Sequence, residues 1–257
     1  MNGFFEQTLF LRAADTDING EWRQSGIFMA MQETGGAHCE GYNLGMAALR
    51  AQNIAWVVSR AHVTMQRLPR IGETVTVRTF PKPPQHFFFP RYYQFFVDGQ
   101  AVGCASTLYV QLDLTTRRMV KPWLGGNDEL TCALEPPMPL PGSLPPCDAP
   151  VTDLSHAAQY SDFDVNGHVN NTRYLDWFCD CFSVAHHRAF SLLEVLIHYN
   201  REVRPNEVVA MSLQNSGEQS ILKGAFEGAP CFAINGVWHP RAAGEVGKPS
   251  TFTVGQP

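Results

Sequence analysis

The sequence predicts an α+β protein built from two copies of one unit, each a long helix followed by four or five antiparallel strands. Three observations lead to this fold class. A motif near the N-terminus recurs in the second half of the chain, and apolar residues at helical spacing follow each copy. Downstream of each helix the apolar residues alternate with a period of two. A chain of 257 residues is long enough to bury a core in each unit.

The repeated motif is a turn rich in Asp and Asn. Four of its residues recur at the same spacing in both halves of the chain: Asp15, Asp17, Asn19 and Gly20, then Asp162, Asp164, Asn166 and Gly167. At the next position the copies differ, because Glu21 in the first half is matched by His168 in the second. We therefore expect the chemistry to reside in the second half.

A helix is predicted after each copy of the motif. Apolar residues share one helical face in the first half (Ile27, Phe28, Met31, with Thr34) and in the second (Tyr174, Phe178, Cys181 and Ala185, broadened by Trp177 and Phe182). Gly35 and Gly36 weaken the first helix near its middle. Residues 44–52 are predicted to add a shorter helix.

Strands are predicted downstream of each helix. Val75, Val77 and Thr79 alternate with more polar neighbours, and similar segments follow in both halves. Turn residues such as Asp98-Gly99 and Asn235-Gly236 lie between or beside these segments, which indicates hairpins. Each helix should be wrapped by its own antiparallel sheet.

A proline-rich segment separates the two units. It crowds seven prolines into a short stretch (Pro136, Pro137, Pro139, Pro141, Pro145, Pro146 and Pro150), which favours an extended, semi-rigid connector. We expect a first domain at residues 1–122, a linker at 123–152 and a second domain at 153–257. The alternative is that the prolines are a ligand for a partner's groove.

Composition excludes several function classes. A net charge of −5 and a pI near 6.0 argue against a nucleic-acid binder. The seven cysteines lack C-x-x-C spacing, and phosphate-binding, dinucleotide-binding and zinc-protease motifs are absent, so no cofactor or metal is expected. The N-terminus does not resemble a signal peptide, and no apolar run approaches a membrane span. A cytoplasmic location is the expectation.

The run DVNGHVNN in the second half is the first candidate site. Amides at the start of a helix hold an oxyanion well, and an imidazole beside them could activate water or protonate a leaving thiolate. Asp164, Asn166 and His168 could project on one side of an extended turn, and Asn166, Asn170 or Asn171 could cap the helix. The alternative is that these residues only form turns and caps, which leaves His168 unexplained.

Glu202 is the second candidate. Aligning Arg201 with Arg67, and Glu207 with Glu73, places Glu202 opposite Leu68. The acidic group is again present only in the second half. By itself Glu202 would be interpreted as an exposed charge on a strand, but beside His168 it becomes a candidate general base or a group that orients the histidine.

These residues carry a resemblance to the acyl-acyl carrier protein thioesterases, the family of the plant fatty acyl thioesterases and their bacterial relatives. The resemblance covers nearly the whole chain. Its most specific segments are DVNGHVNNTRYLDW, WVVSRAHVTMQRLPRIGETVTVRTF and TRRMVKP, with a shorter match in YNREVRPNE.

The resemblance implies a tandem hotdog fold in which the second hotdog carries catalysis and the first supplies most of the acyl pocket. It places Asp164, Asn166, His168 and Glu202 on the family's functional positions. Val203 stands where plant members often have a cysteine, so a cysteine nucleophile is not expected there. Gly167 replaces a glutamine that is common in the motif.

The resulting hypothesis is hydrolysis of a fatty acyl thioester on acyl carrier protein, with the amides of Gly167 and Val169 holding the oxyanion. Basic residues are candidates to receive the acidic carrier: Arg67, Arg70, Arg117, Arg118, Lys121, Arg201 and Arg204. The alternatives are an acyl-coenzyme A thioesterase that uses the same site, a non-catalytic acyl-binding module and a hotdog dehydratase. Monomer and homodimer both remain open.

Overall fold

The computed structural model describes residues 3–125 and 132–241, and within them the repeat appears as a repeat of elements. The first half contains a strand, a 3-10 turn, two helices and four further strands: β1 Phe5–Phe10, η1 Ala13–Asp15, α1 Gln24–Glu40, α2 Met46–Ala51, β2 Ile54–Met65, β3 Thr74–Pro81, β4 Phe88–Val97 and β5 Gln100–Asp113. The predicted short helix over 44–52 is confirmed as α2.

The second half contains the same elements in the same order: β6 Val151–Ala157, η2 Tyr160–Asp162, α3 Arg173–Asp180, α4 Val184–Ala189, β7 Phe190–Tyr199, β8 Val208–Asn215, β9 Gln219–Phe226 and β10 Ala229–Pro240. Within the described residues, all ten strands form one sheet in the order β1-β3-β4-β5-β2-β7-β10-β9-β8-β6. Neighbouring strands in this sheet pair antiparallel, and β2 pairs with β7 at its centre. The two halves therefore share a single sheet that is joined at equivalent strands.

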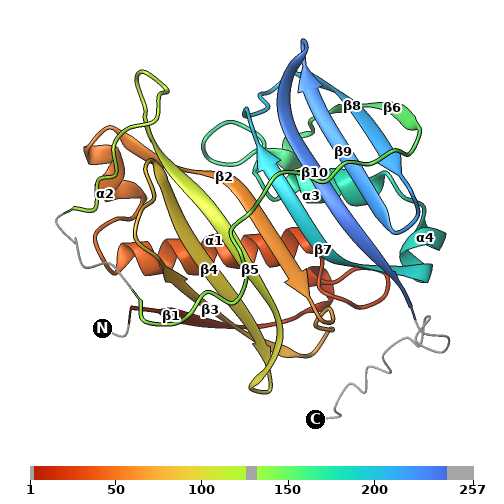
Figure 1. Cartoon of the computed structure of the whole chain (residues 1–257), viewed down its shortest axis with the longest axis horizontal. Helices are drawn as coiled ribbons and strands as arrows, with labels where there is room; N and C mark the ends of the chain where they lie inside the picture. Colours follow the sequence, from red (N-terminus) through yellow and green to blue (C-terminus); the bar gives the residue numbers. More distant parts are fainter. Residues whose placement is uncertain (1–2, 126–131, 242–257) are drawn as a thin grey trace.

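Helices α1 and α3 lie on one face of this sheet, and the segment that leads to β6 crosses the opposite face (Figure 1). Ser106 Oγ donates to the carbonyl of Pro139, and His198 Nε2 lies 2.8 Å from the carbonyl of Gly142, so this segment is held against strands of both halves. Residues 126–131 of the predicted linker lie outside the described residues. The predicted domain boundaries stay predictions.

The core forms where the predicted helix faces meet the sheet. Ile27, Phe28 and Met31 on α1, and Tyr174 and Phe178 on α3, are all buried in one hydrophobic cluster that spans both halves. At about 25 cal/mol per Å² of buried apolar surface, such a continuous core is the main stabilising contribution. The predicted apolar faces are confirmed except at Ala185, which is exposed.

The two central helices differ in length. Helix α1 continues through Gly35 and Gly36 for 17 residues, whereas α3 ends at Asp180 after eight. The predicted face had extended to Ala185, which instead lies in α4. The reason for the break is Ser183, whose side chain accepts a hydrogen bond from the amide of His186 and so begins a separate helix.

Candidate active site

The turn that carries His168 is built by local hydrogen bonds, and we call residues 162–169 the second loop. Asp164 Oδ1 accepts from the amide of Asn166 at 2.8 Å, and the amide of Gly167, which has a φ of +77°, donates to the carbonyl of Asp164. The amide of Asp164 donates to the carbonyl of His168 at 3.1 Å, which closes the turn. His168 Nδ1 consequently lies 4.0 Å from Asp164 Oδ1.

Glu202 meets His168 from a distant part of the chain. The amide of Val169 donates to the carbonyl of Val203 at 2.8 Å, which fixes the second loop against the segment after β7. His168 Nε2 lies 3.7 Å from Glu202 Oε2, and these side chains are 30% and 22% exposed. The structure therefore brings together the two residues that the sequence singled out as specific to the second half.

Two guanidinium groups hold Glu202. Arg204 Nη2 donates to Oε1 at 2.7 Å, and Arg117 Nη2 donates to Oε2 at 2.5 Å. Partial burial acts to raise the pKa of Glu202, but the hydrogen bond from Arg204 and the charge of Arg117 outweigh it and hold the pKa below its usual value. Glu202 is therefore a carboxylate at neutral pH and a weak base.

Asn166 is held between the two halves of the molecule. Its Oδ1 accepts from Nη2 of Arg50 at 3.0 Å, and its Nδ2 lies 3.4 Å from Asp164 Oδ2. Arg50 lies on α2, and Arg117 follows β5, so the first half contributes two arginines to a site in the second. Sequence reasoning missed Arg50 and assigned Arg117 only to carrier binding, because these contacts join residues 116 and 85 positions apart.

The expected oxyanion site needs a correction. Helix α3 begins at Arg173, and its N-cap is Thr172 rather than an asparagine, so the helix start does not lie beside His168. The amides of Gly167 and Val169 both donate to backbone carbonyls and are not open to a ligand. Within the described parts of the chain, two amides of the second loop donate no hydrogen bond, those of Val165 and His168, and the amide of His168 is the one next to the imidazole.

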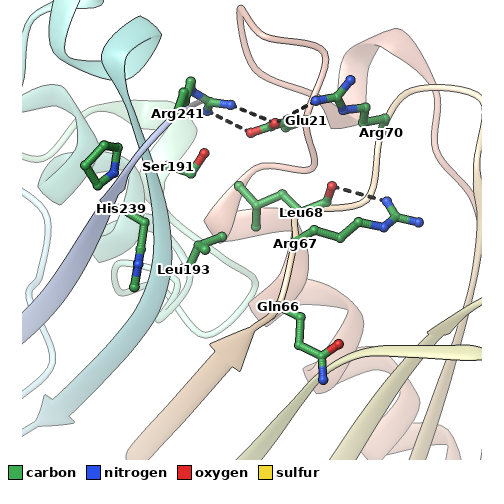
Figure 2. Close-up of a pocket in the computed structure, with 10 residues that line it drawn as sticks. Glu21, Gln66, Arg67, Leu68, Arg70, Ser191, Leu193, His239 and Arg241 are labelled. Atoms are coloured by element: carbon green, nitrogen blue, oxygen red, sulfur yellow. Dashed lines mark hydrogen bonds and ion pairs between the residues drawn. The ribbon is translucent and has the colours of Figure 1, made fainter. Parts of the chain in front are cut away.

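Most of the predicted basic residues make ion pairs within the protein. Arg117 and Arg204 bind Glu202, whereas Arg67 and Arg70 line a separate cavity that includes neither His168 nor Glu202 (Figure 2). Arg201 and Arg67 each bind a carboxylate of their own half, Glu207 and Glu73 respectively. Most of these arginines first serve to hold the protein's own loops.

One sheet made from two helix-bearing repeats, with a histidine and a carboxylate paired in the second repeat alone, defines a tandem hotdog protein with an asymmetric site. Residues 3–122 match the family model described as the acyl-ACP thioesterase N-terminal domain, and residues 149–229 match that of the acyl-ACP thioesterase C-terminal domain. The chain belongs to the acyl-ACP thioesterase family.

Named relatives and solved structures resemble the chain over most of its length. An oleoyl-acyl carrier protein thioesterase of Coriandrum sativum is 24% identical over 80% of this chain, which spans 61% of that relative's length. A Bacteroides thetaiotaomicron acyl-ACP thioesterase superposes with a TM-score of 0.83 at 21% identity, over 93% of this chain and 98% of the other. The 12:0-ACP thioesterase of Umbellularia californica gives 0.79 at 19% identity, over 94% and 99%. These superpositions confirm the tandem hotdog fold.

Within residues 3–125 and 132–241, no helix combines the length and the apolar character that crossing a membrane requires.

Proposed function

We propose that the protein hydrolyses the thioester of fatty acyl-acyl carrier protein and releases the free fatty acid. The observation that carries this proposal is the 3.7 Å approach of His168 Nε2 to Glu202, at a position where the first half has neither group. Membership of the acyl-ACP thioesterase family supports it, as do the names of relatives such as the acyl-[acyl-carrier-protein] hydrolase of Cuphea viscosissima.

In the proposed reaction His168 is the general base and Glu202 orients it. Glu202 is a poor base because two arginines stabilise its charged form, whereas an imidazole exchanges protons near neutral pH. Water attacks the thioester carbon as His168 takes its proton. The C–S bond then breaks, and the same proton passes to the leaving thiolate.

The remaining loop residues position the substrate in this proposal. The free N–H of His168 would bind the oxygen that gains charge, which is the role sequence reasoning gave to its two neighbours. Asn166, fixed by Arg50, would position the water or the carbonyl, and Asp164 would hold the loop. The first half would supply the acyl pocket, as the resemblance implies.

The acyl carrier fits the charge of the site. Side chains of Arg117 and Arg204 are 50% and 60% exposed beside Glu202, so they can also meet the phosphate that links an acyl arm to its acidic carrier. Coenzyme A carries the same arm and is the competing carrier. Comparing kcat/KM for one acyl group on both carriers distinguishes them, and a higher value on coenzyme A would contradict the choice of carrier.

The decisive experiment measures thiol release from acyl carrier substrates by the unaltered chain and by His168→Ala and Glu202→Ala variants. We expect turnover by the unaltered chain, a severe loss in His168→Ala and a smaller loss in Glu202→Ala. Acyl ligand retained without turnover by the unaltered chain would overturn the proposal in favour of a binding module.

A further inference from the structure

A cavity of about 330 Å³ lies where the first half meets the end of the second (Figure 2). One wall comes from the first half, and the other from β7 and from the end of β10. Its lining mixes cationic, anionic, neutral polar and apolar side chains: Glu21, Gln66, Arg67, Leu68, Arg70, Ser191, Leu193, His239, Pro240 and Arg241.

This cavity occupies the place in the first half that the candidate active site occupies in the second. We call residues 15–22 the first loop. Its Asp17 accepts from the amide of Asn19 at 2.8 Å, and the amide of Trp22 donates to the carbonyl of Pro69 at 2.7 Å, which repeats the contacts of the second loop. Glu21 then stands where His168 does, and Leu68 stands where Glu202 does.

The two residues that replace His168 and Glu202 do not form a hydrolytic pair. Glu21 accepts two hydrogen bonds of 2.8 Å from Arg241, and the two side chains are only 6% and 5% exposed. A carboxylate in a bidentate pair with a guanidinium is held as a counter-ion and is a weak base. Leu68 offers no group that could transfer a proton. The two groups proposed to act on a thioester in the second half are therefore both replaced in the first.

The charge and polarity of the lining indicate the class of ligand. Three arginines line the cavity. Arg241 is paired with Glu21 and Arg67 with Glu73, which leaves Arg70 as the cation with the weakest ion pair. Arg70 lies 3.6 Å from Glu21 and is half exposed, so it can turn toward an anion. One guanidinium group can bind two oxygens of a phosphate through two of its N–H groups. Gln66 and Ser191 add hydrogen-bonding groups for a neutral amide, and Leu193 adds apolar contact.

We propose that this cavity binds a phosphopantetheine arm, a phosphate ester with a short amide chain, without hydrolysing it. The inference rests on the proposed function, because the ligand expected at the active site is here assigned to the equivalent position in the other half. The arm can come from acyl carrier protein or from coenzyme A, and both present the same phosphate and amides.

Titration calorimetry of the full chain with free 4′-phosphopantetheine tests the proposal. We expect two sites per chain, and we expect Arg70→Gln to weaken one of them at least tenfold while the affinity of the other stays within twofold. Ser191→Phe fills the cavity without changing its charge and should remove the same site. Arg78→Gln removes a comparable charge from an ion pair with Glu6 outside the cavity lining and should keep both sites.

Several outcomes would overturn the assignment. These are two sites of unchanged affinity in both Arg70→Gln and Ser191→Phe, equal binding of pantetheine that lacks the phosphate, and equal binding of inorganic phosphate alone. A chain that hydrolyses no thioester but still loses a site in Arg70→Gln would overturn the proposed function and leave the cavity assignment standing. Titrations with coenzyme A and with unacylated carrier protein then identify the source of the arm.

Discussion

The first and second loops share a backbone and differ in chemistry. Gly20 and Gly167 both adopt positive φ, of 70° and 77°. In each loop an Asp accepts a hydrogen bond from the amide of the Asn two residues later. The first loop places Glu21 against a guanidinium from the other half, and the second places His168 beside Glu202. The comparison teaches that the duplicated scaffold positions a side chain, and the identity of that side chain separates the ion pair of Glu21 from the catalytic role proposed for His168.

Removing the side chain at this position in each half tests the comparison most strongly. We expect His168→Ala to lower kcat by about 10² to 10⁴, because positioned acid-base groups contribute that much. Thiol-release kinetics measure it. Retention of more than a tenth of the activity would contradict a catalytic role for His168. Glu21→Gln, its counterpart in the first half, should change kcat far less.

The buried pair in the first half should matter for folding instead. Glu21→Ala leaves the guanidinium of Arg241 buried without its bidentate carboxylate, and losing one partner of a buried ion pair costs about 3 to 5 kcal/mol. Urea unfolding followed by circular dichroism measures this loss. Equal stability of Glu21→Ala and of the unaltered chain would contradict a structural role for Glu21 in the first loop.

Arg117 joins the two halves through Glu202, and its removal should shift a pH profile. The charged or titratable groups around Glu202 are Arg204, Arg117, His168 and Tyr174. Because Arg117 helps to hold the pKa of Glu202 below its usual value, Arg117→Gln should raise that pKa. The midpoint of the Glu202 carboxyl titration, followed by carbon-13 NMR, then moves to higher pH.

Arg117→Lys restores the charge and should return the Glu202 midpoint toward its original position. Carbon-13 NMR of the Glu202 carboxyl across the acid range in the three proteins measures it. A lower kcat with an unshifted Glu202 midpoint in Arg117→Gln would limit Arg117 to a structural role.

The smallest effect is expected where the halves are alike. Arg67 binds Glu73 as Arg201 binds Glu207, and in both halves the pKa of the carboxyl is lowered. We expect Glu73→Gln and Glu207→Gln each to cost about 1 kcal/mol. A difference of more than about 2 kcal/mol between the two variants would break the symmetry inferred for these pairs.

The sign of the pH dependence follows from the direction of these shifts. A carboxyl with a lowered folded pKa adds stability above its unfolded pKa of about 4.3, and that stability is lost as the pH falls through the folded value. The cost of both substitutions should therefore vanish in acid. Thermal unfolding at neutral and at acidic pH measures this change.

Most local features, such as the Asp and Asn turns and the helix faces, were predictable from the sequence because they depend on neighbouring residues. The turn predicted at Asn235-Gly236 was wrong, because both residues lie inside β10 and pair with β7. The pairing of His168 with Glu202 is not local, and the difference between the repeats indicated it. The oxyanion donors were not predictable. Val169 donates to Val203, a contact across 34 positions, and only the fold shows that this amide is occupied.

Helix α1 shows why spacing alone misjudges a glycine. Gly35 was expected to weaken the helix, yet a Cβ built there would lie 2.7 Å from the hydroxyl of Tyr93 on β4. A Cβ built at Gly36 would have no atom of another element within 4 Å. The first glycine therefore permits the helix to approach the sheet, which depends on a partner far away in the sequence.

Joining β2 to β7 within a single polypeptide has a consequence for the dilute protein. Arg50 reaches Asn166 and Arg117 reaches Glu202 from the same chain, so their local concentration is set by covalent connection and not by association of separate subunits. Specific activity should then be constant however little protein is in the assay.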